Sequence, residues 1–175
     1  MGVNFTGGAA FTGGSSGFLS DAPIGSIIQI KYFNQNSKIS TTSTSDLQIL
    51  EGDITMKGVN SQVLVWGHIT NFSSANSTGA WTNATYFKLQ YKAAGGSYSR
   101  VAQMEHPGPQ NDVGEFSQCI PVSYYSGTFT QGTQYYFEYA VKPVSSGDTH
   151  YYGRDTDSSA QNVSGARMIL LEIAQ

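Results

Sequence analysis

Few residues of this 175-residue chain could carry out nucleophilic, acid–base or metal chemistry. The three histidines, His68, His106 and His150, lie far apart in the sequence, and Cys119 is the only cysteine. A nucleophilic cysteine needs a neighbouring base and a zinc site needs three or four convergent ligands, but no motif joins these residues. We expect Cys119 to be a buried thiol and the histidines to be satisfied interior or interface side chains. The sequence therefore predicts no enzyme, no cofactor and no metal site; an enzyme whose catalytic groups converge from distant strands is the alternative.

Two aspartates late in the chain could supply oxygen ligands to a hard cation such as calcium. They are Asp155 and Asp157, with Asp148 nearby. The further ligands at fixed spacing that a calcium loop would carry are missing. Loop aspartates more often satisfy local backbone donors, so an ion at this position is left open and is not predicted.

Composition limits the classes of partner. Charged residues make up 12% of the chain and the formal net charge is -3, without a basic run, so we expect no nucleic-acid partner. No stretch reaches the roughly 18 apolar residues of a membrane span, so we expect no membrane insertion. The start of the chain lacks the charged and apolar regions of a signal peptide. Low charge with many small polar residues is common in all-β extracellular and virion-surface proteins.

These residues must be positioned by β-strands, because apolar and polar residues alternate repeatedly and no segment has a convincing helical period. The clearest alternation is Ala84–Lys92, where Phe87, Leu89 and Tyr91 are expected to face the core. Strands separated by turn clusters predict an all-β fold, an antiparallel β-sandwich of jelly-roll type. The expected strands are 25–33, 47–56 with a bend at 51–53, 61–70, 84–92, 98–104, 115–125, 133–142, a short one at 149–152, and 165–175.

The two strands that carry apolar residues on both faces are the most informative about assembly. Residues 61–70 carry Val63, Val65 and Ile69 on one face and Leu64, Trp66 and His68 on the other. The last strand is apolar on both faces and is interrupted only by Glu172, so both of its faces must be covered. We expect one face to meet the core and the other a partner subunit, with Met168 and Leu170 at that oligomer interface. Because both faces are apolar, the sequence leaves open which of them meets the core. The first and last strands are expected to pair and to lie centrally, near an oligomer axis.

Residues 1–24 are expected to form an arm separate from the domain at 25–175. The sequence Phe-Thr-Gly-Gly begins at Phe5 and again at Phe11, and Phe18 follows on the same Gly/Ser-rich string. Such a segment cannot fold alone, because it buries too little apolar surface. A disordered leader is one interpretation; the favoured one is a docking arm whose three phenylalanines fill pockets on another protein.

Exposed aromatic residues are candidates for ligand contact, because they offer a large contact area at low entropic cost. Trp81, in the polar segment Asn71–Asn83, is the best candidate for contact with a ligand or receptor; it could also simply pin that loop. The tyrosine-rich strands are expected to supply core and interface residues, with a host-surface glycan as the other partner for those that face outward.

Three segments resemble a domain found in tail-fibre and capsid-accessory proteins of marine tailed phages. They are Gly25–Ile30 followed by Ser40–Ser45, the element Ser61–Val65 in which an exposed serine precedes an apolar strand, and the closing run Gly165–Ile173 with its single Glu172. Residues around Trp81 and Tyr124–Tyr139 depart from the usual pattern. The resemblance implies a homotrimeric jelly roll shaped like the heads of tumour necrosis factor and C1q, located on the virion.

Together these expectations describe a trimeric capsid decoration or cement protein of a tailed phage, anchored to capsid-shell or tail proteins by its N-terminal arm. The alternatives are a tail-fibre or receptor-binding knob for host adsorption, and a carbohydrate-binding module.

Overall fold

The computed structural model describes residues 22–37, 39–73, 85–106, 116–125, 127–144, 150–152 and 165–175. Within these ranges the chain forms β-strands and no helix. Most of the predicted arm at 1–24 lies outside the described residues. The strands are β1 (Ile27–Gln35), β2 (Ile39–Thr41), β3 (Leu47–Thr55), β4 (Gln62–Ser73), β5 (Thr85–Ala93), β6 (Ser99–His106), β7 (Phe116–Tyr125), β8 (Gln134–Pro143), β9 (His150–Tyr152) and β10 (Ala166–Ile173).

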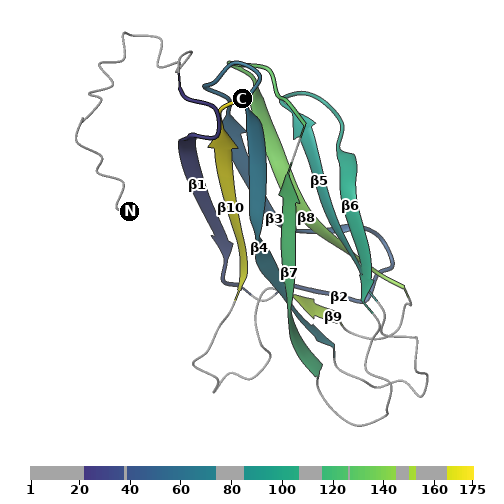
Figure 1. The fold of residues 1–175 in the computed structure, drawn as a ribbon. Helices are drawn as coiled ribbons and strands as arrows, with labels where there is room; N and C mark the ends of the chain where they lie inside the picture. The colour runs from purple at the N-terminus through teal and green to yellow at the C-terminus, as the bar shows by residue number, and fades with distance from the viewer. Residues whose placement is uncertain are drawn as a thin grey trace, which may run out of the picture.

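The strands form two antiparallel sheets packed face to face, which confirms the predicted β-sandwich (Figure 1). Sheet A contains β1, β10, β4 and β7 side by side, and the short strands β9 and β2 extend it beside the far end of β4. Sheet B has the order β3-β8-β5-β6. Every strand pair is antiparallel, as expected for a sandwich in which each sheet turns one face to the core.

The long strands pair in a nested order. β1 pairs with β10 in sheet A, β3 with β8 in sheet B, β4 with β7 in sheet A, and β5 with β6 in sheet B. The predicted pairing of the first and last strands is thus confirmed. β1, however, is not central. It is an edge strand of sheet A, because β10 is the only described strand that pairs with it.

The core between the sheets follows the alternation read from the sequence. Phe87 and Leu89 are buried while the alternating residues Lys88 and Gln90 are only partly covered, and Val63, Val65 and Ile69 are fully buried. At one end an aromatic cluster closes the core: the rings of Phe129 and Tyr135 lie 4.4 Å apart, and those of Tyr91 and Phe137 lie 5.8 Å apart.

Two local expectations are corrected. Residues 51–53 do not bend, because β3 runs unbroken through Gly52, over which the ring of Phe33 packs so closely that no Cβ would fit. The irregularity in β3 lies earlier, between Gln48 and Leu50, and it lets Ile49 and Leu50 both be buried. The polar segment expected to be a loop from Asn71 begins as strand, since β4 continues to Ser73.

Candidate functional site

The outer face of sheet A is the most unusual surface among the described residues. Pairing places Tyr32, Ile169 and Trp66 in one row across β1, β10 and β4. The next row contains Ile30, Leu171 and Leu64. Three of the four outer members of these rows are strongly exposed, Trp66 and Ile30 to 59% and Tyr32 to 54%, whereas Leu64 and the two inner members, Ile169 and Leu171, are half-buried.

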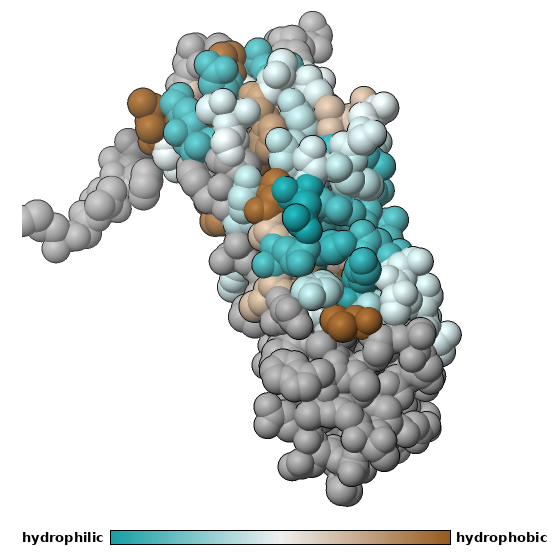
Figure 2. Space-filling model, turned by 90° about the vertical axis from the view of Figure 1, so that its right-hand side faces the viewer, coloured by the Kyte–Doolittle hydropathy of each residue, from teal (hydrophilic) through white to brown (hydrophobic). Residues whose placement is uncertain are grey.

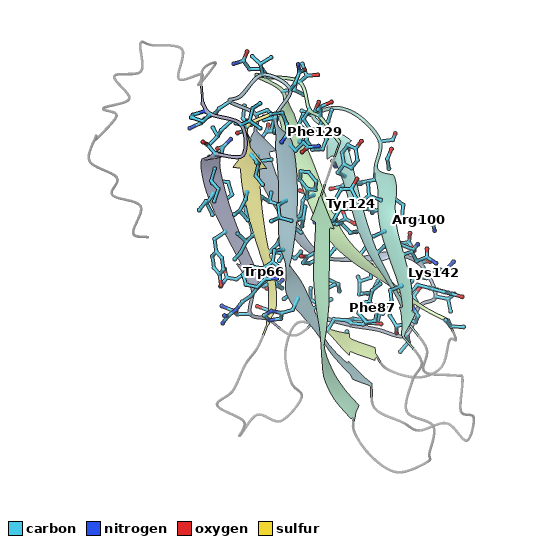
Figure 3. All side chains as sticks on the ribbon, in the orientation of Figure 1. Trp66, Phe87, Arg100, Tyr124, Phe129 and Lys142 are labelled. Carbon is cyan, nitrogen blue, oxygen red and sulfur yellow. The ribbon has the colours of Figure 1, made fainter. Side chains whose placement is uncertain are left out.

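These two rows, which we call the sheet A patch, make a continuous apolar surface. Figure 3 shows Trp66 on the β1–β10 side of the molecule, with Arg100 and Lys142 on the opposite side. Single exposed apolar side chains are ordinary, but a contiguous set on one sheet face marks an interaction site. This geometry is consistent with the prediction that only one face of the last strand packs against the core.

The predicted interface residues on β10 need correction. Met168 and Leu170 are 0% exposed and belong to the hydrophobic core of the single chain, so they have no surface left for a partner. The side chains that point outward are those of Arg167, Ile169, Leu171 and Ile173. Periodicity cannot show which of two apolar faces meets the core. The expectation that Met168 and Leu170 form the outward face is wrong, because the outward face is offset from them by one residue.

Trp66 was not singled out as a contact residue, although the sequence carried the signal. The alternation in 61–70 already placed Leu64, Trp66 and His68 on the face opposite the core valines. An apolar strand whose outward face holds a tryptophan beside a leucine is the pattern of a contact strand.

The outer face of sheet B differs, because its charges are paired within the chain. The Lys88 ammonium lies 2.6 Å from the Asp46 carboxylate, and the Gln134 amide donates to Asp53 at 2.9 Å. Figure 2 shows hydrophilic side chains predominating over the middle of the side on which β6 lies, with only scattered apolar ones. This surface suits contact with water, in contrast to the sheet A patch.

One network on sheet B brings two carboxylates together. Glu51 and Glu138 stand directly opposite each other on β3 and β8, and Glu138 is only 5% exposed. The Gln90 amide donates to Glu138 at 2.9 Å, and the Tyr98 hydroxyl donates to Glu51. Burial first, then the hydrogen bond to Glu51, raises the pKa of Tyr98 far above its usual range, so this phenol stays protonated as a donor. Residue spacing does not indicate this cross-strand carboxylate pair.

A cation lies over the same network. The Lys92 ammonium is 4.1 Å from the centre of the Tyr98 ring and 3.8 Å from the Glu51 carboxylate. It compensates part of the negative charge of the carboxylate pair. The arrangement holds these side chains in place, and it contains no nucleophile.

His68 lies at one end of the sheet A patch, beside Arg167 on β10. Its Nε2 is buried, and no described residue makes a hydrogen bond with it. Desolvation, and to a smaller extent the Arg167 charge, lower the pKa of His68 below 6.5, although a hydrogen bond that the imidazole donates to the backbone carbonyl of Gly165 acts in the opposite sense. His68 is therefore kept neutral near pH 7 at the edge of the sheet A patch.

Glu172, the one charged residue of the final apolar run, is completely buried. Its carboxylate accepts hydrogen bonds from the backbone N–H groups of Lys57 and Gly58 at 2.9 and 2.7 Å, from the Ser61 hydroxyl at 2.5 Å, and from the Gln29 amide at 2.5 Å. Successive N–H groups in a turn form a natural concavity for an anion. Ser61 is fully buried, so the expected exposed serine before this apolar strand is corrected.

The remaining predicted residues fall outside what the structure describes. These are Phe5, Phe11, Phe18, Trp81, Asp155 and Asp157, together with the side chains of Cys119, His106 and His150. Among the side chains that are described, no three of His, Cys, Asp or Glu gather in a way that could hold a metal ion. In the same part of the chain, no helix is long and apolar enough to cross a membrane.

Comparison with known proteins gives distant structural likenesses. No family model matches the chain, and no curated protein matches it. A chain from the structure of infectious bursal disease virus, Gx strain, is similar over 83% of this chain, with a TM-score of 0.43 and 10% identity. This chain covers 32% of the length of that viral chain. The Yersinia pseudotuberculosis-derived mitogen is similar over 81% of this chain and 88% of its own, with a TM-score of 0.26 and 11% identity. Likenesses this remote carry no functional argument.

Proposed function

We propose that this chain is a structural accessory protein of a virus particle that assembles as a homotrimer through the sheet A patch. The observation that carries the proposal is the exposure of Trp66, Tyr32 and Ile30 around half-buried Ile169 and Leu171. The core of an interface between subunits is depleted of charge and enriched in aromatic residues. The two rows of the sheet A patch have this composition.

Further copies of the same chain are the occupant that this surface fits. The central rows of the sheet A patch hold no charged side chain, so they select for an apolar surface, whereas the outer face of sheet B is polar and self-paired. The number of copies comes from the sequence resemblance at Gly25–Ile30, Ser61–Val65 and Gly165–Ile173, which implies a trimer.

The strand order supports a jelly roll as the finer fold assignment. A jelly roll arises when one long hairpin of paired strands wraps into two sheets, so that the first strand pairs with the last and each later pair nests inside. The pairs β1·β10, β3·β8, β4·β7 and β5·β6 follow that nesting and alternate between the sheets.

Decoration of the capsid is the role we propose for the trimer, with the arm at residues 1–24 as its anchor. Three arms carrying Phe5, Phe11 and Phe18 would bind together far more tightly than one, because the first contact raises the effective concentration of the others. A compact domain with a short arm suits a shell surface. A tail-fibre knob that binds a receptor is the competing role, and a carbohydrate-binding module is the third.

The oligomer is tested by the mass in solution of the full chain and of charged variants. We expect a trimer mass for the wild type at micromolar concentration, and monomers for Trp66→Glu and Ile30→Glu, because each places an uncompensated charge in an apolar contact. Met104→Glu is the matched control, since Met104 is an exposed apolar residue on β6 of the other sheet. A monomeric wild type would overturn the trimer, and so would dissociation of Met104→Glu equal to that of Trp66→Glu.

The particle location is tested by electron microscopy of intact particles that carry the protein. Density repeated over the shell supports decoration, and deletion of residues 1–20 should then leave a folded trimer that no longer binds particles. Density confined to the tail supports the knob and makes Trp81 the next residue to mutate. Absence from particles would overturn the virion role while leaving the trimer intact.

A further inference from the structure

A groove of about 400 Å³ opens on the side of the sandwich where the two sheets end. β1 is the edge strand of sheet A and β3 is the edge strand of sheet B, and no backbone hydrogen bonds join them. The groove is lined by residues of these two edge strands and by Ile39 of β2. Its volume falls within the range of small-molecule sites, roughly 300 to 1,000 Å³.

The floor of the groove is apolar. Ile49 and Leu50 are both buried, because the irregularity in β3 after Gln48 puts two successive residues against the core. Ile39 packs against the same core from β2. A flat apolar floor accepts the C–H face of a ring rather than a charged group.

The rim is made of planar polar side chains with unused hydrogen-bonding capacity. No hydrogen bond to a described residue engages the side-chain amides of Asn34 and Gln48. Gln35 uses its amide oxygen to accept from the Ser37 N–H at 3.1 Å, which leaves its NH₂ group available. Each amide can both donate and accept, or donate twice, as adjacent hydroxyls of a ligand require.

Glu51 is the fixed acceptor of the rim. The Tyr98 hydroxyl and the Lys92 ammonium both contact its Oε2, and no contact with a described residue engages Oε1. One oxygen is thus tied from the outer face of sheet B while the other remains for a ligand in the groove. A carboxylate oriented in this way loses little entropy when it accepts a hydrogen bond from a ligand.

We propose that this groove binds a neutral sugar ring. The groove lining contains no cation, so an anionic ligand would meet only the Glu51 carboxylate and would be repelled. A cationic ligand gains less than it would from a lone carboxylate, because Lys92 at 3.8 Å already compensates part of the charge of the Glu51–Glu138 pair. Vicinal hydroxyls over a hydrocarbon face match the amide rim and the aliphatic floor. The groove lining contains none of the six residues of the sheet A patch, although Asn34 lies two residues from Tyr32 on the same face of β1.

The test is a titration of the ¹⁵N-labelled full chain with glucose, galactose, mannose and N-acetylglucosamine in the millimolar range, followed by amide NMR shifts. At least one sugar should give saturable shifts centred on residues 34–35 and 48–51. Glu51→Gln, which keeps the shape of the side chain, and Gln48→Ala should each weaken that binding by about tenfold or more. Gln103→Ala, which removes an exposed amide bonded to Arg100 on β6, should leave it unchanged.

Three results would overturn the proposal. They are the absence of saturable shifts with all four sugars, shifts centred on residues outside the groove, and a response to lysine amide equal to or stronger than that to the sugars. The unperturbed amide shifts of the core strands report that each variant is folded. The mass of the wild type in solution is measured separately, so failure of the sugar site and failure of the trimer remain distinguishable.

Discussion

The Ser61 hydroxyl donates a hydrogen bond of 2.5 Å to the Glu172 carboxylate, and both residues are completely buried. The contact joins the residue before β4 to the end of β10. The backbone N–H groups of Lys57 and Gly58, in the turn between β3 and β4, also donate hydrogen bonds to this carboxylate. A single charged residue in an apolar strand thus has a structural role: it fixes the end of β10 to the turn between β3 and β4.

Removal of the Glu172 carboxylate should destabilise the fold strongly. Glu172→Ala leaves buried N–H and hydroxyl donors without an acceptor, and we expect a loss of about 3 kcal/mol in the free energy of unfolding. Ser61→Ala should cost about 1 kcal/mol, because the backbone donors would still satisfy the carboxylate. Denaturant unfolding measures both values. Asp46→Asn is the control: it breaks only the surface pair with Lys88 and should cost less than about 1 kcal/mol. A Glu172→Ala loss no larger than that of the control would contradict the structural role.

The hydroxyl of Tyr139 is buried against Gly67 with no hydrogen-bond partner among the described residues. Its removal should therefore cost nothing, and Tyr139→Phe is expected to leave stability unchanged or to raise it by up to about 1 kcal/mol. Tyr152→Phe is the matched control, because the Tyr152 hydroxyl shares a hydrogen bond of 3.1 Å with Thr85. That variant should lose about 1 kcal/mol. The midpoint of chemical unfolding compares them, and equal losses would show that Tyr139 has a partner.

Gly67 allows β4 and β10 to approach each other. A Cβ at this position would collide with the backbone carbonyl of Arg167 and with the Tyr139 hydroxyl, and the backbone cannot move aside as a side-chain end could. Gly67→Ala should cost about 3 kcal/mol by forcing the two strands apart. Gly127→Ala is the control, because nothing lies within 4 Å of a Cβ built there. Thermal unfolding should show a large drop for the first variant only.

Stability should fall as the pH drops below 6.5, through His68. Its pKa is lowered in the folded chain by burial and by Arg167, so the unfolded chain binds the proton first and is favoured as pH decreases. Above pH 6.5 both states are neutral and the effect vanishes. Stability measured between pH 8 and pH 5 should therefore decline less steeply in His68→Gln than in the wild type. Parallel curves for the two proteins would contradict this assignment.

The β-sandwich was predictable because alternation is a local property of each strand. The buried set Val63, Val65 and Ile69 and the pairing of the first with the last strand followed from it. The side of β10 that meets the core was not predictable, since Met168 and Ile169 are equally apolar and only packing against β8 and β3 decides. The burial of Ser61 and the pairing of Glu51 with Glu138 depend on which strands become neighbours, and sequence spacing does not carry that information.

The nested strand order sets a schedule for synthesis on the ribosome. β1 has no neighbour in sheet A until β10 pairs with it, and β10 also separates β1 from β4. Folds dominated by contacts between distant segments form slowly, because the chain loses loop-closure entropy before the stabilising strand contacts can form. Sheet A therefore stays open until residues 166–173 have been translated, and the outward row of Ile169 and Leu171 reaches the surface only at that moment. In the proposed trimer, a nascent or truncated chain that ends before β10 would lack Ile169 and Leu171, the middle of the sheet A patch, and would therefore not assemble.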